Sequence, residues 1–210
     1  MPETRDGRTT DTRARILQEA AQLYLAGSYE AVSMQVIANR LHISKAAIFH
    51  HFTNKQELFF EMWLSLLARL QQRLQDAVER SAGGSTQEKL HSLLRCFVRE
   101  AGFDLPRMTQ DVAAFLLPQQ RATLRHVWRN GFIIVRQTLE EGIANGELKP
   151  HNTQLAAYTL LHLGRLVPDP ARPHMLLSES LSQDAYLDGL LNMLLDGLRF
   201  PQNQDRPVDP

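Results

Sequence analysis

The sequence has few of the features that would support a disulfide-stabilised or membrane-embedded protein. Cys96 is the only cysteine among 210 residues, which excludes an intramolecular disulfide and a zinc site built from several cysteines. No apolar stretch approaches the length of about 18 residues needed to span a bilayer, and the first residues are polar and charged. We therefore expect a soluble, cytoplasmic protein without membrane contact.

The chain also lacks an excess of charge of either sign. Its 23 basic residues cancel its 23 acidic ones. Within residues 1–60, seven basic residues stand against six acidic ones, an excess of one positive charge. Binding to any polyanion must therefore depend on where individual side chains and backbone N–H groups at helix starts are placed, not on a strong overall field.

Metal and catalytic chemistry find little support in the sequence. Of the eight histidines, His50 and His51 are adjacent, so their rings point to different faces of a helix, and no pair has the i, i+4 spacing of a helical metal site. The chain contains no recognisable nucleophile–base arrangement, glycine-rich phosphate loop or carboxylate cluster. We expect no metal, no cofactor and no catalytic residues.

Helical periodicity dominates the chain, and no convincing alternating strand appears, which predicts an all-α fold. Serine, asparagine, glycine and proline residues mark most helix boundaries. The expected helices span residues 9–26, 34–41, 45–51, 54–82, 85–101, 106–117, 118–145, 153–167 and 182–198. The proline-rich segment 168–173 is expected to be a loop, and the polar residues 1–8 and 201–210 are expected to be disordered.

The segment 33–52 contains two short helices separated by three residues. An apolar stripe at helical spacing marks the first helix: Met34, Ile37, Ala38 and Leu41. Ser33 can cap this helix, and Ser44 can cap a second one that ends near His51. This arrangement matches a helix-turn-helix, whose second helix enters the major groove of DNA. The sequence therefore predicts a DNA-binding protein.

The run from Thr10 to Leu58 resembles the DNA-binding domain of the tetracycline-repressor (TetR) family of bacterial transcription regulators. The matching residues are Arg13, Ile16, Leu17, Ala20, Ala21, Gly27, Tyr29, Ser33, Met34, Ile37, Ala38, Ile43, Ser44, Lys45, Ile48, Phe49, His51, Phe52, Lys55 and Leu58. The sequence departs from the family at three places: His42 replaces a glycine, Ala46-Ala47 replaces Gly-Thr, and Phe49 replaces a tyrosine. We expect His42 to adopt a left-handed conformation at a cost of about 1 kcal/mol.

The resemblance implies nine helices in two domains. A DNA-binding domain would span residues 9–69, with its helix-turn-helix motif at 33–52, and a ligand-binding and dimerisation domain would span residues 70–200. The family binds double-stranded operator DNA as a homodimer, and a small-molecule effector commonly releases it. The resemblance therefore implies a repressor of this kind.

The expected DNA contacts lie on and beside the second helix of the motif. Lys45 can reach a phosphate or a guanine edge, the methyl groups of Ala46 and Ala47 can meet thymine methyls, and Lys55 lies in a helix first turn that suits a phosphate. The complete predicted set is Ser33, Met34, Gln35, Ser44, Lys45, Ala46, Ala47, Phe49, His50 and Lys55. For Phe49, packing beneath the turn is an alternative to contact with a thymine methyl or a sugar.

Two further surfaces are predicted in the rest of the chain. The resemblance implies a ligand pocket, which we expect to be lined by residues that would otherwise be ordinary core: Trp63, Leu67, Phe97, Met108, Phe115, Trp128 and Phe132. The last helix has a broad leucine stripe that can serve a dimer interface or an intramolecular core. The expected interface residues are Leu187, Leu190, Leu191, Leu194 and Leu195.

The favoured interpretation is a homodimeric repressor that binds a palindromic operator and is released by a small molecule. One alternative is a DNA-binding regulator that acts as an activator or without a ligand. Another, from a different class, is a helical enzyme or interaction module that merely contains this three-helix unit.

Overall fold

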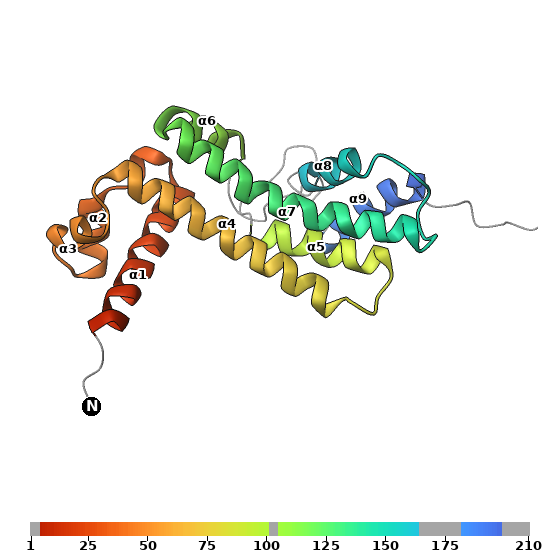
Figure 1. Cartoon of the computed structure of the whole chain (residues 1–210), viewed down its shortest axis with the longest axis horizontal. Coiled ribbons are helices and arrows are strands. Elements are labelled where there is room, and N and C mark those ends of the chain that lie inside the picture. Colours follow the sequence, from red (N-terminus) through yellow and green to blue (C-terminus); the bar gives the residue numbers. More distant parts are fainter. Residues whose placement is uncertain (1–4, 101–104, 164–181, 199–210) are drawn as a thin grey trace, which may run out of the picture. The chain divides into compact units, whose positions relative to one another are not determined.

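The structure, a computed structural model, describes residues 5–100, 105–163 and 182–198, and these residues form nine α-helices and one 3₁₀-helix with no strand (Figure 1). The helices are α1 (Arg5–Ala26), η1 (Tyr29–Ala31), α2 (Met34–Leu41), α3 (Lys45–His51), α4 (Lys55–Arg80), α5 (Thr86–Glu100), α6 (Leu105–Phe115), α7 (Pro118–Ala144), α8 (Thr153–Leu163) and α9 (Gln183–Leu198). The expected all-α, nine-helix fold is confirmed.

Helix boundaries differ from the sequence-based expectation in a few places. Helix α1 begins at Arg5, not near residue 9, so residues 5–8 of the expected disordered arm are helical. The 3₁₀-helix was not expected; Ser28 caps it by accepting a hydrogen bond from the Glu30 N–H. The expected loop at 168–173 and the expected tail at 201–210 lie outside the described residues.

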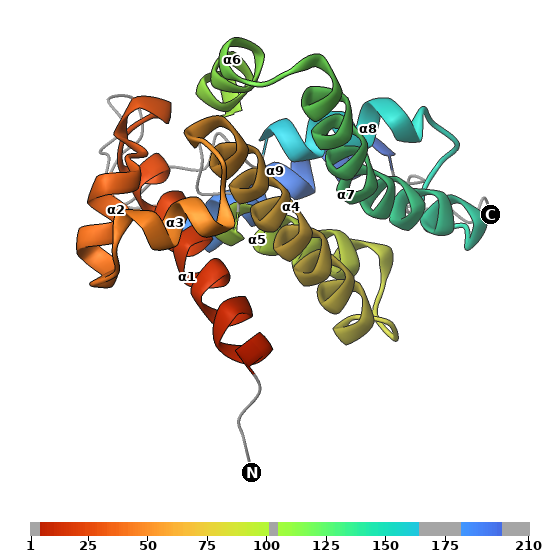
Figure 2. The same ribbon diagram turned by 60° about the vertical axis from the view of Figure 1, so that its left-hand side comes forward.

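The described residues group into two compact units. The first unit comprises those within residues 1–70 and 102–129, and the second comprises those within 71–101 and 130–210. In the first unit, α2 packs against α1 and α3 packs against α2 (Figure 2). Its fully buried side chains come from α1 to α4: Ile16, Tyr24, Ile37, Ile48, Phe52, Leu58, Phe59, Met62 and Trp63. Residues 105–129, which come much later in the chain, complete this unit.

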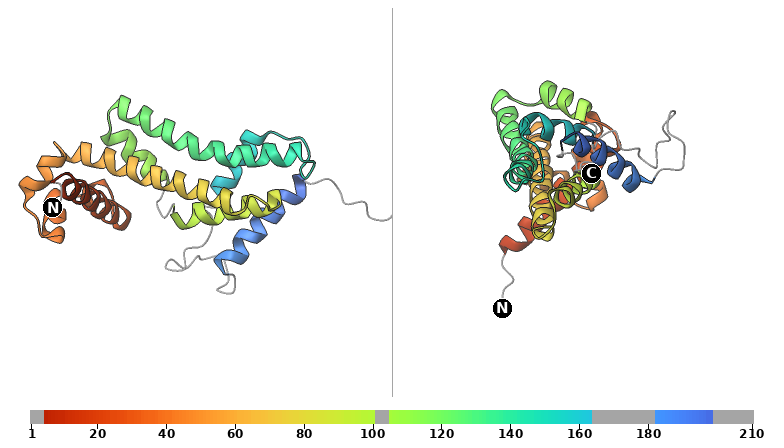
Figure 3. Two further views of the ribbon diagram at one scale, coloured as in Figure 1. Left: turned by 60° about the horizontal axis from the view of Figure 1, so that its bottom comes forward. Right: turned by 90° about the vertical axis from the view of Figure 1, so that its right-hand side faces the viewer.

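The second unit is built around α5. Helix α9 (blue in Figure 3) lies against α5, and α8 also contacts α5. Three leucines spaced four residues apart on α9 (Leu187, Leu191 and Leu195) are each no more than 2 % exposed and so belong to this core. At its edge, the side chains of Gln87, His91 and Arg95 pair with Asn192, Asp188 and Asp184, respectively. These polar pairs fix the antiparallel register of α5 and α9.

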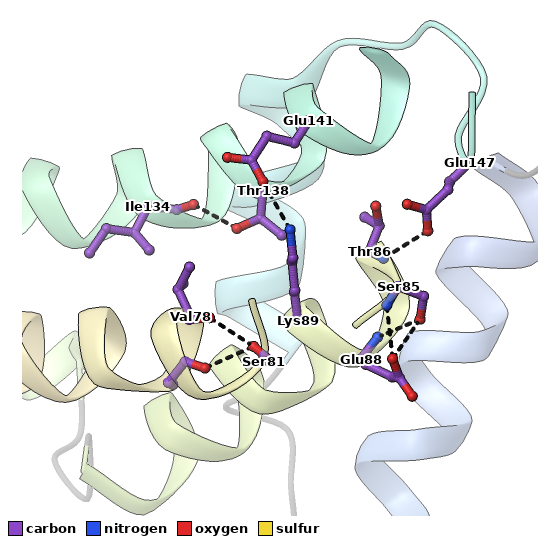
Figure 4. A network of polar contacts seen from close by, with 11 residues as sticks. Val78, Ser81, Ser85, Thr86, Glu88, Lys89, Ile134, Thr138, Glu141 and Glu147 are labelled. Atoms are coloured by element: carbon purple, nitrogen blue, oxygen red, sulfur yellow. Dashed lines mark hydrogen bonds and ion pairs between the residues drawn. The ribbon is translucent and has the colours of Figure 1, made fainter. Parts of the chain in front are cut away.

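The N-terminus of α5 illustrates how local sequence and tertiary contacts combine (Figure 4). Ser85 and Glu88 form a capping box: the Ser85 N–H donates to Glu88 at 2.8 Å, and the Glu88 N–H donates to the Ser85 hydroxyl at 3.3 Å. A third helix-start N–H, that of Thr86, donates to Glu147 at 2.8 Å. Glu147, which follows α7, therefore ties the end of α7 to the start of α5.

Within the described ranges, no helix is both long and apolar enough to cross a lipid bilayer.

Candidate nucleic-acid interface

Two serines and one histidine define the geometry of the helix-turn-helix. The Ser33 hydroxyl accepts from the Val36 N–H at 3.5 Å, and the Ser44 hydroxyl accepts from the Ala47 N–H at 3.0 Å. Both serines therefore cap their helices, as expected. His42 ends α2 in the left-handed conformation, with φ 53° and ψ 43°. The turn that redirects the chain into α3 thus has the strained residue that the sequence predicted.

The inner face of the motif fixes α3 against the rest of the first unit. Ile37 and Ala38 of α2 and Ile48 of α3 are almost fully buried, and Phe52, directly after α3, is 1 % exposed. Met34, one of the predicted DNA contacts, is only 7 % exposed. Its side chain therefore packs in the core and is not available at the surface.

The opposite face of α3 is exposed. Lys45, Ala46, Phe49 and His50 are exposed along it, and Phe49 is 46 % exposed, a high value for a phenylalanine. The Lys45 Nζ lies over the Phe49 ring, 5.8 Å from its centroid. The alternative of Phe49 packing beneath the turn does not match this exposure. The predicted contacts on α3 therefore share one accessible surface, with Ala47 half-buried at its edge.

The start of α2 adds to this accessible surface. Gln35 is exposed, and its Nε2 donates to the Asn39 Oδ1 at 3.0 Å. Val36, which was not predicted as a contact, is 38 % exposed beside it. The only sequence signal for Val36 is that it falls outside the apolar stripe of α2.

Ion pairs engage most of the basic residues around the motif. Arg13 pairs with Glu61 at 3.0 Å, and Arg40 pairs with Glu19 at 2.6 Å. Among the described residues, Lys45 has no acidic partner. Lys45 is thus the cation on α3 whose charge is available to a phosphate or a base edge.

Lys55, at the first residue of α4, occupies a more constrained position. Its Nζ lies 4.1 Å from the centroid of the Tyr29 ring and 3.7 Å from the Glu30 Oε2, and it donates to the Glu30 carbonyl at 3.4 Å. Its side chain nevertheless keeps 29 % of its exposure. The ammonium is therefore held in place at the helix start and remains accessible.

The start of α4 is capped by Asn54 and Glu57. The Glu57 N–H donates to the Asn54 side chain at 2.8 Å. The Glu57 carboxylate accepts from the hydroxyl of Thr53 at 2.5 Å and from its N–H at 2.6 Å, whereas a standard capping box would use the Asn54 N–H. These hydrogen bonds, led by that of the Thr53 hydroxyl, lower the pKa of Glu57 below its usual value.

The two adjacent histidines of α3 differ in their surroundings. His50 is exposed, whereas His51 is half-buried beside Phe52. Burial first, and then the nearby His50 and Arg13, lower the pKa of His51. His51 is therefore neutral at pH 7 and serves packing, while His50 is the histidine that faces solvent.

Comparison with known proteins agrees with this geometry. Residues 16–62 match the family model described as "Bacterial regulatory proteins, tetR family". The chain is 26% identical over 155 residues to the HTH-type transcriptional regulator YhgD of Bacillus subtilis (strain 168). This aligned stretch covers 73% of this chain and 80% of that protein. A TetR/AcrR-family regulator from Thermobifida fusca YX-ER1 matches in structure with a TM-score of 0.65 and 27% identity, over 90% of this chain and 100% of that one. Residues 16–62 form a DNA-binding domain of the tetR family, and the whole chain shares the fold of a TetR/AcrR-family regulator.

A further relative is named as an operon repressor. This chain is 30% identical over 82 residues to the probable acrEF/envCD operon repressor of Escherichia coli (strain K12). The match covers 38% of this chain and 37% of that protein. These matches confirm a DNA-binding transcription regulator, and they confirm the expectation that the chain is not an enzyme.

The residues predicted for the ligand pocket of this TetR-family chain fall in both units. Trp63 and Phe115 lie in an aromatic cluster of the first unit, which we define as Tyr24, Tyr29, Phe59, Trp63 and Phe115. Leu67, Met108 and Trp128 belong to the first unit as well, whereas Phe97 and Phe132 belong to the second. A groove of about 510 Å³ between α1 and α4 is lined by none of these seven residues. The pocket assignment stays a prediction.

The residues predicted for the dimer interface divide into two groups. Leu187, Leu191 and Leu195 are buried within the chain itself, whereas Leu190 and Leu194 are half-buried. Residues that were not predicted are more exposed: Met193 on α9 is 77 % exposed, and Leu155 and Tyr158 on α8 are 64 % and 56 % exposed. Gly189 and Gly197, four residues on either side of Met193, face open space: a Cβ added at either position would meet no other group within 4 Å. Periodicity alone could not identify this face because two of its positions are glycines.

Proposed function

We propose that this TetR-family regulator is a homodimeric repressor that acts in the cytoplasm and reads a palindromic operator through α3. The observation that carries this proposal is the exposed face of α3. Lys45, Ala46 and Phe49 lie together on a helix that Ser44 caps and that buried Ile48 anchors. A rigidly packed helix with small and cationic side chains facing outward suits the major groove.

Each exposed group has a defined chemical role on DNA. The small Ala46 side chain lets the helix backbone approach the bases, and its methyl group can contact a thymine methyl. Phe49 offers a larger apolar surface of the same kind. Lys45 donates to a phosphate or to a guanine edge. Lys55 and the free N–H groups at the start of α4 bind a phosphate, which fixes the position of α3 on the duplex.

Titration of operator DNA with single variants tests this assignment. The operator is first obtained by sequencing genomic fragments that co-purify with the protein. Lys55→Ala should weaken binding to all sequences and reduce the salt slope by about one, the signature of a lost phosphate contact. Lys45→Ala should behave in the same way if it contacts phosphate, or relax base preference by about 1–3 kcal/mol if it contacts guanine.

The matched control removes a lysine from the second unit. Lys149→Ala lowers the net charge by the same amount but should leave operator affinity and salt slope unchanged. If Lys45→Ala and Lys55→Ala both bind the operator as tightly as the parent protein, α3 is not the recognition helix. If all three variants weaken binding equally, the effect is one of total charge and not of placement.

The proposed dimer interface is the exposed face of α8 and α9. Met193, Leu155 and Tyr158 are large apolar side chains that a lone chain leaves in water. Leu190 and Leu194 flank this face on α9, and Gly189 and Gly197 allow close approach of a partner helix. The predicted leucine stripe thus contributes its half-buried members, while its buried members support the core beneath.

Met193→Arg tests the interface without disturbing the fold, because the side chain is already 77 % exposed. Arginine would place an unpaired charge in a desolvated contact, which is strongly unfavourable. Sedimentation should show monomers, and specific operator binding should be lost because half-sites about 34–36 Å apart require two linked subunits. The control is Leu117→Arg, at an apolar residue of the first unit that is 50 % exposed. A Met193→Arg variant that stays dimeric would exclude this face.

Release by a small molecule is the remaining part of the proposal. We expect the dimer to have two conformations, and in one of them the spacing of the two DNA-binding domains does not fit the operator. A ligand that binds this conformation more tightly weakens operator binding, by a factor set by its difference in affinity for the two conformations. An inducer should therefore raise the melting temperature of the free protein and lower its operator affinity. Operator DNA should weaken inducer binding by the same factor.

A metabolite screen that reads melting temperature and operator affinity together tests this step. Trp128→Ala should abolish the response to an identified inducer and leave operator binding intact. A screen in which no compound shifts both quantities would favour the ligand-independent alternative. A reporter gene whose expression falls when the protein is deleted would favour an activator.

A further inference from the structure

Tyr29 lies between a residue of α6 and the ammonium of Lys55. Its ring stacks on that of Phe115 with centroids 3.8 Å apart and planes at 12°. The Lys55 Nζ lies over the same ring, 4.1 Å from its centroid. Because the Phe115 ring fills the space above one face of Tyr29, the ammonium must occupy the other face. The three side chains therefore form a layered stack: Phe115, Tyr29, Lys55.

The position of Tyr29 in this stack depends on Phe115. Tyr29 belongs to a three-residue 3₁₀-helix, which offers little rigidity of its own. The Phe59 ring meets Tyr29 edge-on at 4.8 Å and packs against it from the side. Phe115 contributes the parallel contact that sets the plane of the ring. The ring plane in turn determines where a cation can lie, since the attraction is strongest over the face.

Phe115 is itself anchored by its backbone. The Nε2 of Gln56, the residue after Lys55, donates to the Phe115 carbonyl at 2.6 Å. In addition, the buried Tyr24 hydroxyl donates to Asp111, one turn earlier on α6, at 2.9 Å. Neither contact involves the Phe115 side chain. The end of α6 therefore stays docked on the first unit when that side chain is replaced.

We propose that Phe115 is a positioning residue for operator binding: it orients Tyr29, and Tyr29 holds the Lys55 ammonium toward the DNA phosphate. Glu30 supplies the competing attraction, because its carboxylate lies 3.7 Å from the same ammonium. When the Tyr29 ring is not held in this orientation, the Lys55 ammonium pairs with Glu30 more of the time and is less available to bind a phosphate. The inference rests on the proposed phosphate contact of Lys55 and adds a residue of α6 to the DNA-binding machinery.

A double-mutant cycle on operator affinity tests this role. Phe115→Leu keeps an apolar side chain but removes the stacked ring, and it should weaken operator binding by about two- to fivefold, the factor expected of an exposed cation–π contact. Phe115→Tyr, which retains the ring, should bind like the parent protein. In a Lys55→Ala background, Phe115→Leu should have no further effect, because the cation that it positions is gone.

Controls separate this inference from the proposed function. Leu117→Ala, at an exposed residue two positions further along the chain, should leave affinity unchanged, and circular dichroism checks that every variant is folded. If Phe115→Leu weakens binding equally with and without Lys55, its role is structural and the inference is wrong. If Lys55→Ala weakens binding but Phe115→Leu does not, the inference fails and the phosphate contact stands. If Lys55→Ala has no effect, the phosphate contact itself fails.

Discussion

Replacing His42 with glycine should stabilise the protein. His42 ends α2 at φ 53° and ψ 43°, the only positive φ of a non-glycine residue in the described part of the chain. An L-residue with a Cβ pays about 1–2 kcal/mol in this conformation because the Cβ crowds the following carbonyl oxygen. The imidazole is exposed and makes no hydrogen bond among the described residues, so removing it loses little.

The expected magnitude is the difference between two effects. Glycine relieves about 1–2 kcal/mol of strain in the folded state, but it also gives the unfolded chain more freedom, which costs about 0.5–1 kcal/mol. The net gain in the free energy of unfolding is therefore about 0.5–1 kcal/mol. For a chain of this size, such a gain corresponds to a rise in melting temperature of roughly 1–4 °C.

The matched control is His42→Ala, which removes the same imidazole and keeps the Cβ. Urea unfolding at one fixed protein concentration should show a higher midpoint for His42→Gly with an unchanged slope, and a midpoint close to that of the parent for His42→Ala. His42→Asn should fall between them, because asparagine tolerates the left-handed region. Equal stabilisation by alanine and glycine would refute the reasoning, since the effect would then arise from the imidazole and not from the backbone.

Three further predictions concern helix starts and helix packing. Ser44→Ala should lower the free energy of unfolding by about 1 kcal/mol in urea melts, while Ser44→Asp should restore stability yet weaken operator binding, because its charge opposes the phosphates. Gly142→Ala should destabilise by about 1–2 kcal/mol, since its Cβ would lie 2.6 Å from the Thr86 side chain, whereas Gly131→Ala, with 3.5 Å of room, should not. The pKa of Glu57 is lowered on folding, so its stabilisation should be fully present above its ordinary pKa of 4.5 and lost as the pH falls through the pKa of the folded state. Glu57→Gln should flatten that part of the curve of unfolding free energy against pH. An unchanged curve would exclude this contribution.

Local features of the sequence predicted the helix-turn-helix well. Ser33 and Ser44 cap their helices, and His42 adopts the left-handed turn, because each of these roles depends on residues within a few positions along the chain. The apolar stripe of α2 likewise identified its buried face. Met34 belongs to that stripe, so its place among the predicted DNA contacts conflicted with a signal already present in the sequence.

Long-range features could not be predicted in the same way. A leucine stripe does not distinguish an intramolecular core from an exposed face, so the sequence could not show that Leu187 and Leu191 are buried while Met193 is exposed. The Tyr24–Asp111 hydrogen bond joins residues 87 positions apart. Nothing in the local pattern around either residue indicates the other. The docking of α6 on the first unit therefore required the structure.

The return of residues 105–129 to the first unit has a consequence for engineering chimaeric regulators. A DNA-binding module cut after residue 70 would lack Asp111 and Phe115. The Tyr24 hydroxyl would then lose its hydrogen-bond acceptor, Asp111, and the Tyr29 ring would lose the Phe115 ring that stacks on it. A functional graft must therefore transfer two separate stretches of sequence, with the intervening α5 left to the recipient. Substitutions on α6 are therefore constrained by the DNA-binding end of the chain, since Asp111 of α6 contacts Tyr24, which lies 87 positions earlier.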